Sequence, residues 1–156
     1  MSEVLAAGGG PAAPLRALLI GGYFGTWVDA VAAADAPFSE AGLGELKAGV
    51  GAGLVVALPA SACGLVETAR IARYLADESA GQCGPCGFGL DAIADQLARL
   101  AMGAEPDLAL LQRWVGQVGS GRGACKHPDG TVRMIASTLE VFSREVEQHV
   151  RGWCGG

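Results

Sequence analysis

The hydrophobic positions along the chain follow two different periods, and the change comes near residue 60. Before it, two short apolar runs, Leu15–Ile20 and Leu54–Leu58, are bounded by glycine-rich segments, which is typical of buried strands. Beyond it, apolar residues recur at helical spacing in four runs. The predicted helices cover residues 62–76, 87–101, 106–118 and 131–152, the last with Asp129 as its N-cap. Short loops join them, so consecutive helices are expected to lie antiparallel.

Several weaker signals precede residue 61. Residues 2–7 are predicted to form a short helix with Ser2 as its N-cap, residues 28–36 are helical or irregular, and residues 43–47 form a connector. Residues 21–27 form a glycine-flanked aromatic turn, whose rings are expected to cover a small sheet; a ligand contact is the alternative. The G-x-G within residues 49–53 precedes a strand, whereas a dinucleotide fingerprint follows one, so no nucleotide site is expected there.

Composition and charge restrict the class of protein. The chain has 156 residues, 51% of them hydrophobic, which suffices for one ordinary domain or two small ones. Its net charge of −5 gives no support for a nucleic-acid partner. The N-terminal residues lack the features of a signal peptide, and the most hydrophobic stretch, residues 50–66, is short and contains Pro59. We therefore expect a soluble, cytoplasmic protein with no membrane insertion.

The cysteines carry the strongest chemical signal. Cys83 and Cys86 lie in a Gly- and Pro-rich turn between the first two predicted helices, and Cys125 lies in a similar turn between the last two. Two helix–turn–helix units can bring these thiols together at one end of a four-helix bundle, which suits an iron–sulfur cluster. The total of five cysteines is odd, and C-x-x-C spacing fits metal or redox chemistry in a reducing compartment better than a disulfide framework.

Residues 78–89 resemble the iron–sulfur segment at the C-terminus of the flavin-binding subunit of NADH:quinone oxidoreductase (complex I), which subunits of NAD-linked hydrogenases and formate dehydrogenases share. The family pattern is E-S-C-G-x-C-x-P-C-R-x-G, with a further cysteine far downstream. The matching residues are Glu78, Ser79, Gly81, Cys83, Pro85, Cys86 and Gly89, with Cys125 at the distant position. Two positions depart from the pattern: Ala80 stands in place of the first cysteine, and Gly87 replaces the arginine.

The resemblance extends from about Leu15 to Val150 and implies an α+β fold. It places a partial β-grasp segment in residues 1–60 and a helical iron–sulfur domain, a four-helix bundle, in residues 61–156. It implies a module that passes electrons from a flavin- and NADH-binding protein or domain to an iron–sulfur or ferredoxin-like acceptor. No self-contained catalytic site is expected, and neither FMN nor NAD is expected to bind this chain alone. The alternative is a non-redox interaction or assembly module on the same fold that has lost its cluster.

Cys83, Cys86 and Cys125 are the expected cluster ligands, for a 4Fe-4S cluster or for a 3Fe-4S cluster that needs three thiols only. His127, two residues beyond Cys125, is the candidate fourth ligand, because imidazole ligates iron in some clusters. Other candidates for the fourth place are Ser79, Glu78 or water. A zinc site made by the three thiols and His127 is a further alternative.

The other two cysteines are predicted at the far ends of their helices. With a helix rise of ~1.5 Å per residue, each lies roughly 20 Å or more from the turns, which excludes both as cluster ligands. Cys63 is expected to be a small buried hydrophobe, and Cys154 a free thiol in a frayed tail. His149 and Glu145, on the last predicted helix, are expected to be solvated.

Overall fold

The computed structural model describes residues 1–154. Three strands form an antiparallel sheet in the order β2-β1-β3, with β1 at Leu15–Ile20, β2 at Thr26–Asp29 and β3 at Val55–Pro59. Leu19 of the central strand lies opposite Trp27 on one side and Val56 on the other. Both predicted strands are confirmed. The prediction of a simple aromatic turn at residues 21–27 is wrong at its C-terminal end, where Thr26 and Trp27 begin a strand.

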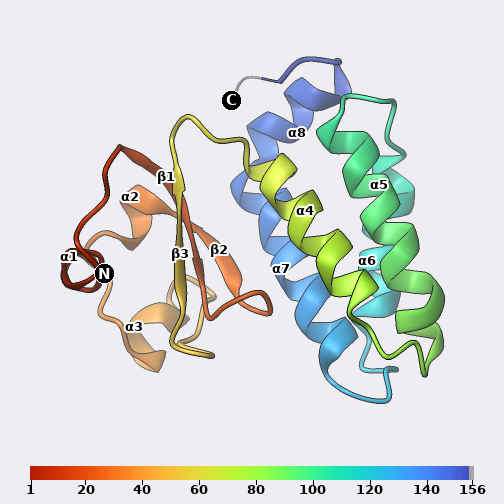
Figure 1. Ribbon diagram of the computed structural model, residues 1–156, viewed down its shortest axis with the longest axis horizontal. Helices are drawn as coiled ribbons and strands as arrows, with labels where there is room; N and C mark the ends of the chain where they lie inside the picture. Colours follow the sequence, from red (N-terminus) through yellow and green to blue (C-terminus); the bar gives the residue numbers. More distant parts are fainter. Residues whose placement is uncertain (155–156) are drawn as a thin grey trace.

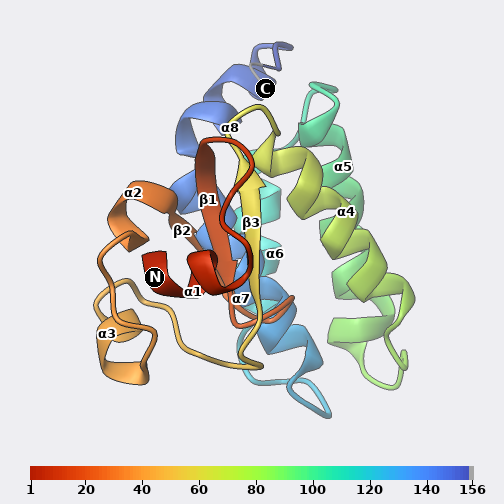
Figure 2. The same cartoon turned by 60° about the vertical axis from the view of Figure 1, so that its left-hand side comes forward.

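Three short helices cover the outer face of this sheet: α1 at Ser2–Ala7, α2 at Ala30–Ala33 and α3 at Glu40–Gly44. Figure 2 shows β1 and β3 running between these helices and the long helices behind. The buried residues of this small core are Met1, Leu18, Ile20, Val28, Ala33 and Leu43. The helix at residues 2–7 is confirmed, but its N-cap is Met1, because the Ser2 hydroxyl donates instead to the Ala34 carbonyl.

The rest of the chain is helical. Its elements are α4 at Gly64–Asp77, the π-helical turn η1 at Pro85–Leu90, α5 at Asp91–Ala101, α6 at Leu108–Val118, α7 at His127–Val141 and α8 at Ser143–Val150. All four predicted helical runs are therefore present, and the expected mixture of a small sheet with several helices is confirmed. The last run differs in two ways: it begins at His127, so that Asp129 lies inside its first turn, and it breaks at Phe142.

The inner face of the sheet packs against the helices, so sheet and helices share one core. Leu19, Trp27 and Leu58 belong to the same buried cluster as the apolar faces of the long helices. α7 lies directly against β2, and Figure 1 shows the sheet on one side of the helical layer. Trp27 joins the two: its backbone N–H donates to the Ser137 hydroxyl at 2.9 Å, and its ring meets the Phe142 ring edge-on.

In the part of the chain that the structure describes, the helices all lack either the length or the apolar character needed to span a bilayer.

Candidate functional site

The first thiol turn connects α4 to η1. After α4 ends at Asp77, Gly81 adopts a φ of +65°, a conformation that favours glycine and lets the chain reverse ahead of Cys83. Cys83 is half-buried in the loop, and Cys86 is buried in η1. The Gly87 N–H donates to the Cys83 carbonyl at 2.8 Å. This bond holds the two cysteines within a single turn.

The second thiol turn connects α6 to α7 and carries Cys125 on its exposed side. The Asp129 carboxylate, in the first turn of α7, accepts the Gly121 N–H at 3.0 Å and pairs with Lys126. A Cβ on Gly123 would lie 3.0 Å from Pro128 Cγ, so only glycine fits there comfortably. Local contacts therefore fix the path of this turn. Asp129 was predicted to cap the helix, and instead it braces the loop before it.

The two turns come close to each other at Cys83, Cys86 and Cys125. Backbone N–H groups of Ala124, from the second turn, and of Cys86 stabilise the Cys83 thiolate and lower the pKa of Cys83. Burial, together with the nearby thiols of Cys83 and Cys125, raises the pKa of Cys86 to about 11. The thiols predicted as ligands thus lie within electrostatic reach of one another. N–H groups aimed at sulfur are the surroundings that a cluster-binding thiolate requires.

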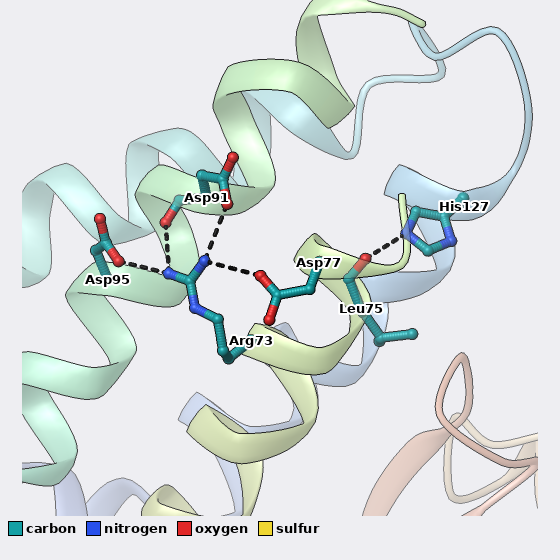
Figure 3. Close-up of polar contacts among 6 residues, drawn as sticks. All are labelled: Arg73, Leu75, Asp77, Asp91, Asp95 and His127. Atoms are coloured by element: carbon teal, nitrogen blue, oxygen red, sulfur yellow. Dashed lines mark hydrogen bonds and ion pairs between the residues drawn. The ribbon is translucent and has the colours of Figure 1, made fainter. Parts of the chain in front are cut away.

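His127 is the first residue of α7, beside the thiol turns, but its ring contacts residues outside those turns. Its Nε2 is 2.8 Å from the Leu75 carbonyl, near the end of α4 (Figure 3). Phe24 packs edge-on against its ring. A carbonyl can only accept, so Nε2 carries the proton of a neutral ring. The nitrogen left with a lone pair is then Nδ1. Any bond from His127 to a metal has to come from that atom.

An ion-pair network holds the helices on either side of the first turn. Arg73 of α4 reaches Asp91 at 2.9 Å and Asp95, both on α5, as well as Asp77 on its own helix (Figure 3). The four side chains are largely solvent-exposed, so each pair contributes little to stability by itself. The network nevertheless fixes how the C-terminal part of α4 faces α5, and that relation sets the geometry of the turn between them.

The prediction of a solvated His149 is wrong. The side chain of His149 is 1% exposed, and its Nε2 lies 3.4 Å from the Cys63 sulfur. Glu145 is also not on a solvated face, because its carboxylate pairs with Arg16 and accepts the Gly64 N–H at 3.1 Å. These contacts lie at the opposite end of α4 from the thiol turns.

Cys63 and Cys154 belong to this second group. Burial raises the pKa of Cys63, and the neighbouring Cys154 thiol adds to the effect. Among the described residues, only Cys63, His149 and Cys154 bring three cysteine, histidine or acidic donor atoms within 4.8 Å of one another. The three turn thiols do not form such a group.

Comparison with known proteins shows which family the chain belongs to. Residues 66–149 match the family model described as the NADH-ubiquinone oxidoreductase-F iron-sulfur binding region. The matched range exceeds half of the chain and contains Cys83, Cys86 and Cys125. The chain belongs to this family. Membership confirms the resemblance expected from residues 78–89 and supports an iron–sulfur cofactor for this iron-sulfur binding region.

Two curated relatives are F subunits of NADH-quinone oxidoreductase. The protein from Buchnera aphidicola subsp. Baizongia pistaciae (strain Bp) is 29% identical over 115 residues, which cover 72% of this chain and 26% of the relative. The protein from Salmonella typhimurium (strain LT2) is 29% identical over 120 residues, covering 75% of this chain and 27% of the relative. The chain thus spans about a quarter of the length of these relatives.

Solved structures show the shared fold. NAD⁺-reducing NiFe-hydrogenase superposes with a TM-score of 0.82 in its H2-reduced state and 0.80 in its air-oxidized state. Each match is 20% identical in sequence and covers 95% of this chain and 25% of the hydrogenase chain. The likeness includes both the sheet and the helices, because it leaves only a twentieth of this chain unmatched.

Proposed function

We propose that this chain is an iron–sulfur electron-transfer module of an NADH-dehydrogenase-like oxidoreductase. The observation that carries the proposal is the convergence of Cys83, Cys86 and Cys125 within the matched iron-sulfur binding region. The donor set fits the cofactor, since three thiols from two turns meet where backbone N–H groups point at sulfur. When bound, an iron–sulfur cluster accepts and releases a single electron.

The surrounding residues fit that role. Cys83 and Cys86 would hold one side of the cluster, and Cys125 the other, with His127 Nδ1 or water as the fourth ligand. Cys86 is 5% exposed whereas Cys125 is exposed, so the site reaches from the helix core to the surface. A redox partner can approach from that surface. In this proposal the partners are a flavin- and NADH-binding protein or domain as donor and an iron–sulfur or ferredoxin-like acceptor, in the cytoplasm.

The proposal includes the finer architecture expected from the sequence. Residues 61–156 act as a four-helix bundle with the thiol turns at one end, and residues 1–60 as a partial β-grasp segment packed on its side. The pairing of α4 with α5 and of α6 with α7 supports the bundle, because each pair encloses one thiol turn. This arrangement holds the two turns at a fixed separation while electrons enter and leave.

One observation favours a second function. Ala80 stands where the family pattern places a cysteine, so this chain offers one thiol fewer than that pattern. A chain that lost its cluster in this way would serve as a non-redox interaction or assembly module on the same fold. Iron content separates the two functions, because only the electron-transfer module holds iron and sulfide after anaerobic purification.

The proposed ligands can be tested by substitution. Anaerobically purified Cys83→Ser, Cys86→Ser and Cys125→Ser proteins should each lose most of their iron and their visible absorbance, because each removes one of three protein thiolates. Cys63→Ser and Cys154→Ser are matched controls and should retain iron, because helix length places them roughly 20 Å away. Full iron content in Cys125→Ser would remove the two-turn site from consideration. A parent protein without iron would favour the assembly module.

A second test addresses the fourth ligand. Ala80→Cys restores the family's thiol and should give a 4Fe-4S cluster that survives air longer than that of the parent protein, because thiolate is a stronger ligand than water. If His127 supplies the fourth ligand, His127→Ala should shorten the lifetime of the parent cluster but have little effect beside Ala80→Cys. No change in iron count, spectrum or lifetime on Ala80→Cys would mean that residue 80 does not face the cluster.

A further inference from the structure

A second set of metal-binding side chains lies at the end of the helices opposite the thiol turns. Cys63 immediately precedes α4, His149 lies in the last turn of α8, and Cys154 follows that helix. Figure 1 shows the start of α4 and the end of α8 near the C-terminus, away from the end at which α7 begins. The donor atoms of the three side chains lie within 4.8 Å of one another.

His149 is oriented as a metal-binding histidine is. It is 1% exposed, and its Nδ1 lies 3.0 Å from the Leu100 carbonyl at the end of α5. Because a carbonyl only accepts, Nδ1 must carry the proton of the neutral ring, and this assigns the lone pair to Nε2. That nitrogen faces the Cys63 sulfur at 3.4 Å. Histidines that bind metals usually donate their other N–H to a carbonyl or carboxylate, which fixes the ring in this way.

The distance between the Cys63 and His149 donor atoms matches tetrahedral coordination. Zinc binds thiolate sulfur at ~2.3 Å and imidazole nitrogen at ~2.0–2.1 Å, so a sulfur and a nitrogen on one tetrahedral ion lie about 3.6 Å apart. The Cys63 Sγ to His149 Nε2 distance of 3.4 Å is close to this value. Two thiolates and one neutral imidazole also balance the charge of a divalent ion. We propose that Cys63, His149 and Cys154 form a zinc site, separate from the thiol turns.

Backbone contacts bring Cys154 to the site. Beyond α8 the chain reverses at Gly152, whose φ is +76°, and the Trp153 N–H donates to the Gln148 carbonyl at 3.1 Å. Gly103, just after α5, packs against this reversal: a Cβ there would lie 3.1 Å from Gly152 Cα. The tail is thus turned back toward α4 by its own hydrogen bonds. Zinc then binds a thiol that is already near, and the two cysteines release their protons on binding.

The fourth coordination position faces solvent. Cys154 is exposed, whereas the nearest carboxylate, that of Glu145, lies 3.9 Å from the Cys63 sulfur and is engaged by Arg16 and the Gly64 N–H. Water therefore completes the site, and Glu145 fixes the start of α4 beside it. An ion held here joins α4, α8 and the tail. Because the three ligands come together only in the folded chain, zinc should bind it more tightly than the unfolded chain and so stabilise this end of the molecule.

The test uses Zn²⁺ alone, titrated into the reduced, metal-free chain of 156 residues under nitrogen, in competition with a chromophoric chelator. The decisive variant is Cys154→Ser, because Cys154 lies outside the helices and its loss leaves the core intact. Removing a direct ligand should weaken zinc binding at this site by more than about 100-fold, beyond the effect of losing an outer hydrogen-bond partner. Zinc should also raise the melting temperature of the parent protein but not that of Cys154→Ser.

Cys125→Ser is the matched control, because it removes an exposed thiol from the other end and should leave this zinc affinity unchanged. His149→Gln should lose binding as Cys154→Ser does. Zinc binding that survives Cys154→Ser but disappears in Cys125→Ser would overturn the proposal, because the ion would then occupy the thiol turns. A parent protein that binds no zinc would overturn it as well. A Cys63–Cys154 disulfide that mass spectrometry still detects in the presence of reductant would also overturn it.

Discussion

The contact between η1 and α6 gives the sharpest test of how the first thiol turn is held. Gly89, in η1, lies so close to α6 that a Cβ built on it would be 2.5 Å from Val118 Cγ2. Val118 is 6% exposed and β-branched, so its side chain has little freedom to rotate away. Gly89→Ala should therefore push η1, which carries Cys86, away from α6. The free energy of unfolding and the iron content should both fall.

Two opposing effects set the size of the change in the free energy of unfolding caused by Gly89→Ala. Alanine is favoured over glycine in a helix by about 0.8–1 kcal/mol, whereas overpacking a core contact costs about 1–3 kcal/mol. We expect Gly89→Ala to lower the free energy of unfolding by about 1 kcal/mol. In a Val118→Ala background the sign should reverse, because the next atoms from the new Cβ, Val118 Cβ and the Gly84 carbonyl oxygen, are at 3.8 and 3.9 Å, ordinary contact distances. The coupling energy should be about 2 kcal/mol.

Urea unfolding followed by circular dichroism measures the free energy of unfolding of the four proteins: the parent, the two single variants and the double variant. Gly116→Ala is the matched control: it makes the same change within α6, where the new Cβ would meet no atom within 4 Å. That variant should be more stable than the parent by about 0.5–1 kcal/mol. If Gly89→Ala and Gly116→Ala stabilise the protein equally, or if the coupling with Val118→Ala is near zero, the close contact does not hold η1 in place.

Two further outcomes follow from the turn and from the sheet. In reduced, metal-free protein, iodoacetamide should label Cys83 before Cys86 at neutral pH, because the lowered pKa of Cys83 gives more thiolate. Cys86, with a pKa of about 11, should react only as the pH rises toward that value. Equal labelling rates of the two cysteines, measured by peptide mass mapping, would contradict this. Ser137→Ala should lower the free energy of unfolding in urea by about 1–3 kcal/mol, because the buried backbone N–H of Trp27 loses its acceptor. The control, Ser120→Ala at an exposed position, should stay within about 0.5 kcal/mol of the parent.

Patterns within single segments predicted most of the fold. The apolar stripes of α4, α5 and α6 are long enough to identify each helix, and the run at Leu15–Ile20 gave its strand with the correct bounds. The missed strand, β2, has four residues and follows a glycine-rich turn, so it carries no alternating pattern of its own. It is a strand because it pairs with β1 and packs on α7. Neither contact is visible in local sequence.

The same distinction applies to the two groups of thiols. Cys83, Cys86 and Cys125 were predicted as ligands because each lies in a turn between two helical patterns, and short loops bring such turns together. His149 was missed because its helical neighbours are polar, and the sequence therefore indicated an exposed face. It is buried because the end of α5, nearly 50 residues earlier, packs over it, and its Nδ1 bonds the Leu100 carbonyl. No short-range signal indicates that contact.

The core shared by the sheet and the helices makes the folding of the chain cooperative. Trp27 fills the space between β2 and α7, and Arg16 of β1 pairs with Glu145 of α8. A fragment that began at residue 61 would expose the surface that Trp27 covers and would leave Glu145 without its cation. We therefore expect such a fragment to be less stable than the whole chain. A destabilising substitution in the sheet, far from any sulfur, would lower the folded population of the whole chain. The thiol turns would be disrupted to the same extent, although no residue near them had changed.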